Sequence, residues 1–222
     1  MANILVLLTN HPVLGTTDEP NGTYIPELTH ALAVLIDAGH EYTLASIHGG
    51  EAPFYGTDPE DQVTQRLLAN TAFMDALNNT QKLETLDASA FDGVFYPGGF
   101  GLLSDLAEHP NAAALSAEVY EKGGILAAVC HGPAGLLPIT LSNGEPLLAQ
   151  IHVTGFTREE EIDFGTIDKI PFLLEEALAR NAKQYSKVKP WQSLVIADER
   201  VITGQNPASA HAVGEAMVKH LQ

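Results

Sequence analysis

The chain has 222 residues, of which 45% are hydrophobic and 18% are charged, a composition typical of a globular protein with a buried core. Its 28 Asp and Glu residues outnumber its 11 Lys and Arg residues, and the formal net charge of −17 makes phosphate backbones and anionic lipid unfavourable partners. No segment approaches the roughly 20 apolar residues of a membrane-spanning helix, and one cysteine cannot form an internal disulfide. We therefore expect a cytoplasmic protein with no nucleic-acid or membrane partner.

The first 61 residues predict two strands joined by a helix. The apolar run over Asn3–Thr9 has the length of a buried central strand, and no basic segment precedes it, which favours a strand over a signal peptide. Apolar residues then recur at helical spacing over Tyr24–Ala38, and Tyr42–Ser46 is a second short strand. These elements form a right-handed βαβ unit, and residues 47–61 predict a loop.

The middle of the chain predicts two helices and two strands. The helices are expected over Thr64–Asn79 and Pro110–Lys122, and the strands over Gly93–Tyr96 and Ile125–Val129. The first of these strands stops at Pro97-Gly98-Gly99, where adjacent glycines leave the backbone free to bend closely round a ligand. An ordinary turn between a strand and a helix fits the same residues.

The last third of the chain predicts a turn, an acidic run, a hairpin and two helices. Asn143-Gly144 indicates a turn, and two of the three glutamates at 159–161 are expected on a solvated face. The remaining predicted elements are a helix over Ile170–Leu178, strands over Leu194–Ala197 and Arg200–Thr203 separated by a two-residue turn at Asp198-Glu199, and a helix from about Pro207 to Leu221. The whole pattern predicts one α/β domain over residues 1–222, with a mostly parallel sheet and helices on both faces.

The only cysteine lies where a predicted strand runs directly into a predicted helix. Cys130 follows the apolar run that ends at Val129, and Gly132-Pro133 begins the helix without a spacer, so the corner must be tight. A helix N-terminus stabilises an anion, which predicts a thiol pKa below its free value of about 8.5. A lone cysteine is more commonly a buried structural residue, but the adjacent His131 favours a nucleophile.

Four motifs occur in order along the chain. They are Tyr96-Pro-Gly-Gly-Phe-Gly101, the Cys130 corner, Thr154-Gly-Phe-Thr157 with its following acids, and Thr203-Gly-Gln-Asn-Pro-Ala-Ser-Ala210. In this combination the chain resembles the DJ-1/PfpI superfamily, and within it the Hsp31-like group, over nearly its whole length. The resemblance implies a flavodoxin-like three-layer sandwich with the cysteine at a nucleophile elbow.

The resemblance also implies the roles of individual residues. Cys130 matches the nucleophile and His131 its neighbour in a triad, whose third member is an acid after the Thr154 motif, Glu161 by spacing or else Glu160. Glu27 matches an acid near the start of the first helix that faces the thiol. Without the resemblance, Glu27 is only a first-turn acid that complements the helix dipole.

Backbone amides of Gly99 and His131 match the oxyanion hole of this family. No His-x₃-His or Cys-x₂-Cys spacing indicates a metal site. Three aromatic residues, Tyr24, Phe156 and Trp191, are candidates for a pocket wall, although such residues more often belong to the core.

The function that the resemblance implies is that of a glutathione-independent glyoxalase of the glyoxalase III, or D-lactate dehydratase, type. Such an enzyme is a homodimeric, cofactor-free lyase that detoxifies methylglyoxal and related 2-oxoaldehydes under stress, converting them to 2-hydroxy acids through a cysteine hemithioacetal. One alternative is a chaperone, deglycase or oxidative-stress sensor of the same family. Another is a small-amide hydrolase or peptidase, but related amidotransferases use a His-x-Glu motif well after the cysteine, and none follows His131 here.

Overall fold

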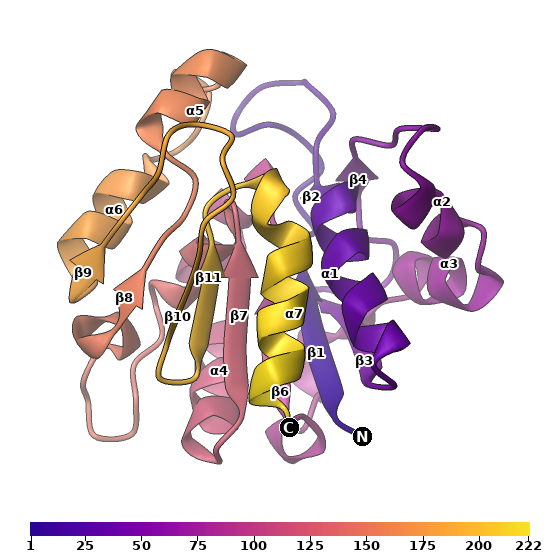
Figure 1. Cartoon of the computed structure of the whole chain (residues 1–222), viewed down its shortest axis with the longest axis horizontal. Coiled ribbons are helices and arrows are strands. Elements are labelled where there is room, and N and C mark those ends of the chain that lie inside the picture. Colours follow the sequence, from indigo (N-terminus) through magenta and orange to yellow (C-terminus); the bar gives the residue numbers. More distant parts are fainter.

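A seven-stranded β-sheet forms the centre of the computed structural model, which describes residues 1–222. In chain order its strands are β1 (Asn3–Leu8), β3 (Glu41–Ser46), β5 (Gln81–Lys82), β6 (Gly93–Tyr96), β7 (Ile125–Val129), β10 (Val195–Asp198) and β11 (Val201–Gly204). They lie in the spatial order β10-β11-β7-β6-β1-β3-β5 (Figure 1). All neighbours are parallel except the edge strand β10, which is antiparallel to β11. The predicted mostly parallel sheet is confirmed.

Helices cover both faces of this sheet, as predicted. They are α1 (Ile25–Asp37), α2 (Gln62–Leu68), α3 (Thr71–Asn78), α4 (Pro110–Glu121), α5 (Arg158–Phe164), α6 (Leu174–Asn181) and α7 (Ala210–His220). Helices α1 and α7 pack together on one face, and α4 lies on the other (Figure 1). None of these helices has the length and apolar character needed to cross a membrane.

Short elements complete the fold around the sheet. Four two-residue strands form two parallel pairs. In one pair β2 (Thr23–Tyr24) lies beside β4 (Phe54–Tyr55), and in the other β8 (His152–Val153) lies beside β9 (Gln184–Tyr185). The 3₁₀ helices are Leu83–Thr85, Ala88–Ala90, Phe100–Leu103, Leu106–Glu108, Gly132–Leu136, Leu147–Gln150 and Pro207–Ser209.

The central strands are buried on both sides. In β1, Ile4, Val6 and Leu8 belong to the core beneath α1 and α7, whereas Leu5 and Leu7 belong to the core on the α4 side. Successive side chains of a strand point to opposite faces, so a continuous apolar run marks a strand covered on both faces. This alternation produces the three layers of the predicted sandwich.

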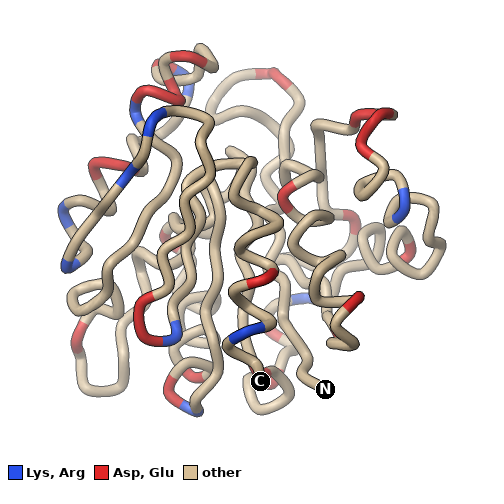
Figure 2. Tube along the Cα trace, in the orientation of Figure 1, with Lys and Arg blue, Asp and Glu red and all other residues tan.

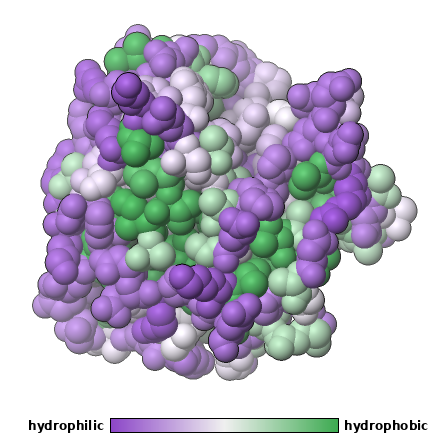
Figure 3. Space-filling view, viewed as in Figure 1, coloured by the Kyte–Doolittle hydropathy of each residue, from purple (hydrophilic) through white to green (hydrophobic).

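Charged residues are absent from the middle of the sheet. Strands β1, β6 and β7 carry none, and acidic residues spread over the outer helices and loops (Figure 2). On the face that carries α1 and α7, the widest hydrophobic area lies over β10 and β11, beside α7 (Figure 3). Val195 and Ile196 of β10 are half-buried there, as expected for an edge strand covered incompletely.

Two predicted helices have different boundaries in the structure. The single helix expected over residues 64–79 is two helices, α2 and α3, because the Asn70 side chain accepts hydrogen bonds from the amides of Ala72 and Phe73 and starts a new helix. The helix expected over residues 170–178 begins later, at Leu174. Its core contacts come from Leu174 and Leu178, and no side-chain cap marks its start.

The turn of the C-terminal hairpin lies one residue later than predicted. Asp198 pairs with Val201, so Glu199 and Arg200 form the turn, and Glu199 adopts φ +52°. Asp198 stays in the strand because its carboxylate accepts a hydrogen bond of 2.7 Å from the amide of His152.

The helix predicted after Cys130 is only the 3₁₀ helix Gly132–Leu136. It packs directly against β6, where a β-carbon at residue 132 would overlap the carbonyl oxygen of Tyr96, and one at residue 135 would touch the Tyr96 ring. Both positions therefore require glycine, and this close approach brings the Cys130 corner against the end of β6.

We expect Gly132→Ala to destabilise the protein by about 3 kcal/mol, because the added methyl group meets rigid backbone in a packed core. Gly123→Ala is the control, since its methyl group would meet no atom within 4 Å and only its φ of +99° opposes the change. Urea unfolding measures both variants. A smaller loss for Gly132→Ala than for Gly123→Ala would contradict the packing argument.

Candidate active site

Cys130 lies at the C-terminal end of β7, where parallel α/β sheets bind their ligands (Figure 1). Its φ is +60°, a left-handed conformation that costs of order 1–3 kcal/mol for such a residue. Hydrogen bonds hold it from both sides: its amide donates to Gly204 O at 2.9 Å, and its carbonyl accepts from Phe156 N at 2.9 Å. The predicted tight, strained corner is confirmed.

His131 lies between the thiol and a buried carboxylate. Its Nδ1 is 3.4 Å from Cys130 Sγ, and its Nε2 is 2.6 Å from Glu161 Oε1. The other oxygen of Glu161 accepts a hydrogen bond from the Thr166 hydroxyl. His131 and Glu161 are both only 1% exposed, so water does not compete for this pair. A proton on Nε2 shared with the carboxylate leaves Nδ1 free to accept the thiol proton.

Glu27 approaches Cys130 from the first turn of α1 and is completely buried. Neither of its carboxylate oxygens has a partner at hydrogen-bond geometry. Burial raises the pKa of Glu27 to about 8, although the neighbouring Cys130 thiol and Gly98 amide partly offset this rise. A β-carbon at Gly98 would overlap Glu27 Oε2 and lie 2.8 Å from Cys130 Cβ, so this glycine permits the contact.

The predicted lowering of the Cys130 pKa is wrong in direction. Burial raises the pKa of this thiol well above its usual value, and the nearby Glu27 carboxyl raises it further. The prediction relied on a helix N-terminus, but only a five-residue 3₁₀ helix follows the cysteine. The geometry instead offers a neighbouring base, His131, to remove the thiol proton.

Two backbone amides have no hydrogen-bond partner. The N–H groups of Gly99 and His131 donate no hydrogen bond within the chain. Gly99 has a φ of +123°, and a β-carbon there would overlap Gly22 O. These two residues therefore have free donors of the kind that an oxyanion hole requires.

Two of the three consecutive glutamates are buried, which contradicts the expectation that two would be solvated. Glu159 is exposed and pairs with Lys187, but Glu160 and Glu161 are 0% and 1% exposed. Only Glu161 contacts His131, so the alternative assignment of Glu160 to that position is wrong. The helical turn of α5 separates the three side chains because consecutive residues point about 100° apart.

Glu160 has a different task. Its Oε1 accepts hydrogen bonds from Trp191 N (2.9 Å), Gln205 Nε2 (3.1 Å) and Asn206 Nδ2 (2.7 Å), and its Oε2 accepts from the amide and hydroxyl of Thr157. This buried carboxylate has no cationic partner, and neutral donors alone satisfy it. It joins the start of α5, the segment around Trp191 and the Thr203–Ala210 motif.

A cavity of about 230 Å³ opens above Cys130. Its lining includes all three aromatic residues considered for a pocket wall, Tyr24, Phe156 and Trp191. The other lining residues are Tyr55, Phe100, Cys130, His131, Phe164 and Pro207. Phe100 and Phe156 hold the His131 ring between them, with centroid distances of 4.4 and 4.5 Å.

The sequence did not predict five residues of the site, namely Thr166 and the lining residues Tyr55, Phe100, Phe164 and Pro207. Phe100 and Pro207 lie within the motifs of the sequence, so a signal for them existed. Tyr55 lies in the predicted loop and Phe164 follows the acidic run, and no spacing marks either one. Burial and the neighbouring Cys130 and Glu27 raise the pKa of Tyr55, so its hydroxyl remains protonated at neutral pH.

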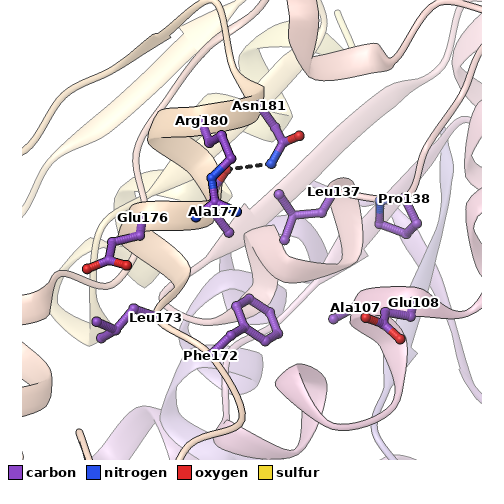
Figure 4. A pocket seen from close by; sticks show the side chains of 10 residues that line it. All are labelled: Ala107, Glu108, Leu137, Pro138, Phe172, Leu173, Glu176, Ala177, Arg180 and Asn181. Atoms are coloured by element: carbon purple, nitrogen blue, oxygen red, sulfur yellow. Dashed lines mark hydrogen bonds between the residues drawn. The ribbon is translucent and has the colours of Figure 1, made fainter.

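A larger hollow of about 480 Å³ lies elsewhere, between α6 and the segments around Glu108 and Leu137 (Figure 4). Phe172 projects into it, and Glu176 and Arg180 of α6 border it (Figure 4). None of its lining residues is a nucleophile or belongs to the Cys130 cluster. The smaller cavity is therefore the candidate active site.

A strained cysteine after a parallel strand, next to a buried His–Glu pair, defines an α/β protein with a nucleophile elbow. Residues 21–220 match the DJ-1/PfpI family, and the chain belongs to this family.

Named relatives cover nearly the whole chain. Glyoxalase 3 of Candida albicans is 29% identical over 98% of both chains, and the glutathione-independent glyoxalase HSP31 of Saccharomyces cerevisiae is 28% identical over 99% of this chain and 97% of its own. Among solved structures, the 24-kDa rapid encystment protein of Francisella tularensis has a TM-score of 0.95, 32% identity and 100% coverage of both chains. Glyoxalase III of Candida albicans has a TM-score of 0.87 and 28% identity, covering 99% of this chain and 97% of its own.

The pKa of Glu27 predicts how stability depends on pH. Below about pH 4.5 the carboxyl is protonated in both folded and unfolded chains, whereas between there and about pH 8 only the unfolded chain releases the proton. The contribution of Glu27 to stability is therefore fully present at low pH and is lost as pH rises to about 8. At about 1.4 kcal/mol per pKa unit, the loss amounts to several kcal/mol.

Glu27→Gln removes this titration, so its stability relative to the unchanged protein should increase steadily from pH 5 to pH 8. Urea unfolding at a series of pH values measures the difference. A difference independent of pH would show that the carboxyl is ionised in the folded protein.

We expect Glu160→Ala to cost about 3 kcal/mol or more, because it leaves several buried donors without an acceptor. Glu159→Ala, next to it and exposed, should cost about 1 kcal/mol or less. Trp191 is the only tryptophan, so its fluorescence should shift in Glu160→Ala and stay unchanged in Glu159→Ala. An unshifted spectrum in both variants would contradict the role of Glu160 in holding Trp191.

Proposed function

We propose that the protein is a glutathione-independent glyoxalase, a cofactor-free lyase that converts methylglyoxal and related 2-oxoaldehydes to 2-hydroxy acids. The observation that carries the proposal is the arrangement of Cys130 between a protonatable carboxyl, Glu27, and the His131–Glu161 pair in one small cavity. The names of the relatives from Candida albicans and Saccharomyces cerevisiae support the same reaction.

The first step forms the covalent intermediate. His131 Nδ1 takes the thiol proton while Cys130 Sγ adds to the aldehyde carbon, and Glu161 stabilises the imidazolium that results. The aldehyde oxygen becomes an oxyanion, to which the free amides of Gly99 and His131 can donate. Activation by a neighbouring base accounts for reactivity despite the raised pKa of the thiol.

The second step moves a proton between two carbons. Protonated Glu27 first donates its proton to the oxyanion, giving the neutral hemithioacetal and a carboxylate. That carboxylate takes the C1 proton, giving an enediolate. The same carboxyl then returns the proton to C2 while the C1 hydroxyl proton passes to the C2 oxygen, giving the thioester of the 2-hydroxy acid. A pKa of about 8 suits Glu27 to this shuttle, because an acid–base catalyst works best when its pKa is near the working pH. Water finally hydrolyses the thioester, and the thiol regains its proton.

A small-amide hydrolase is the second candidate, because Cys130, His131 and Glu161 also have the contacts of an acyl-transfer triad. One observation favours the glyoxalase: acyl transfer has no use for the carboxyl of Glu27 beside the nucleophile. The cavity of about 230 Å³ is small for a peptide chain but not for a small amide.

A chaperone or deglycase role, or oxidative-stress sensing, remains an alternative proposal. The exposed apolar side chains of Ile162, Phe164 and Trp191 are the feature that a holdase would use. We also propose a cytoplasmic homodimer, as expected from the sequence. The hydrophobic area over β10 and β11 is a surface that a second copy could cover (Figure 3).

Turnover of methylglyoxal without glutathione, followed by chiral analysis of the lactate, tests the proposal. Cys130→Ser should abolish turnover, whereas a holdase activity should survive it. Glu27→Gln should lower kcat about 10²–10⁴-fold, because it removes the proton shuttle. It should still form an adduct at Cys130, detected as a mass increase.

Glu41→Gln is the matched control, because Glu41 is exposed at the start of β3 and its side chain makes no hydrogen bond. It should keep normal activity. Normal lactate production by Glu27→Gln would make His131 the only shuttle, and an absent adduct would mean that Glu27 instead controls the thiol's ionisation.

A further inference from the structure

The outer half of the active-site cavity is built from aromatic rings. Phe156 and Trp191 lie edge to face at 5.7 Å, Phe164 and Trp191 are 6.3 Å apart, and Phe100 stacks on Phe164 at 5.9 Å. Tyr24 and Tyr55, 5.2 Å apart, also line the cavity. No Lys or Arg lines the cavity, so this wall has no cationic side chain for an anionic group, but it offers a large surface to an apolar one.

The rim of this wall is exposed yet held in place. Phe164 is 57% exposed and Trp191 is 43% exposed, although such rings are normally buried. Trp191 has a φ of +64°, its amide donates to the buried Glu160, and its indole N–H lies 3.3 Å from Asp163 Oδ2. A strained backbone and two polar anchors thus fix an apolar ring in contact with water, which favours a ligand that covers the ring.

The cavity is larger than methylglyoxal needs. In liquid water each molecule, which has one non-hydrogen atom, occupies a volume of about 30 Å³. If this volume is taken as the upper limit for each non-hydrogen atom, the five such atoms of methylglyoxal occupy at most about 150 Å³. By the same limit the ten atoms of a phenyl-substituted 2-oxoaldehyde occupy at most about 300 Å³, so such a molecule can fill the cavity of about 230 Å³ and reach its rim.

We propose that the preferred substrates are 2-oxoaldehydes with an aromatic or similarly large apolar substituent, and that Trp191 and Phe164 determine this specificity. The inference rests on the proposed glyoxalase activity. The aldehyde carbon lies at Cys130, and the substituent lies against the aromatic rim. Covering that rim removes apolar surface from water, which a methyl group is too small to do.

Kinetics with phenylglyoxal and methylglyoxal test the proposal. The unchanged protein should have a kcat/KM at least tenfold higher for phenylglyoxal, after correction for aldehyde hydration. Trp191→Ala and Phe164→Ala should each reduce this ratio about tenfold, because differences of one or a few carbons in an apolar pocket are worth about 10–200-fold.

Ile162→Ala is the matched control, because Ile162 is 54% exposed on the same helix as Phe164 but does not line the cavity. It should leave the ratio unchanged. Methylglyoxal turnover with a ratio near one, or a ratio that Trp191→Ala does not alter, would overturn the specificity and leave the proposed function intact.

A binding measurement tests the specificity for large apolar substituents separately from the glyoxalase activity, because it requires no turnover. Isothermal titration of Cys130→Ala with 1-phenyl-1,2-propanedione and with 2,3-butanedione compares the same two substituents on inert diketones. At least tenfold tighter binding of the phenyl compound would support the specificity even if neither aldehyde is turned over, in which case the glyoxalase proposal fails. Equal binding of the two diketones would overturn the specificity.

Discussion

The left-handed corner at Cys130 is the constraint on which the candidate site depends. Its amide and carbonyl are tied to Gly204 and Phe156, so three distant parts of the chain meet at one residue. Gly132 then allows the following 3₁₀ helix to press against β6. The strain at this corner, of order 1–3 kcal/mol, persists because these surroundings leave the backbone no alternative.

Three buried glutamates surround the corner, and their partners distinguish them. Glu160 accepts from neutral donors on every side, and Glu161 is shared between His131 and Thr166. Glu27 lies beside the Cys130 thiol and is completely buried, and this burial raises its pKa to about 8, so it holds a proton near neutral pH. Similar side chains thus serve as a structural anchor, as the proposed orienting group of the histidine, and as the proposed acid–base catalyst.

Local patterns were enough for much of the fold. The apolar runs at β1 and β7 predicted buried parallel strands, because only a strand covered on both faces is apolar at every position. Boundaries without a strong local signal were less accurate. Asn70 can follow one helix or cap the next, and no cap marks the start of α6, so packing decided both. The short 3₁₀ helix after Cys130 also packs closely against Tyr96, a contact between residues that are distant in sequence.

The sequence alone determined the α/β class and the corner that holds Cys130, because strand periodicity is a local property. The ordered motifs, through the family that they resemble, added the candidate residues Glu27, His131 and either Glu161 or Glu160. Only the tertiary structure decided which glutamate contacts His131, since Glu160 and Glu161 are adjacent in sequence and differ only in where the turn of α5 directs them. It also reversed the direction of the thiol pKa shift. Burial and the approach of Glu27 produce that shift, and both come from residues that are distant in sequence and meet only in the folded chain.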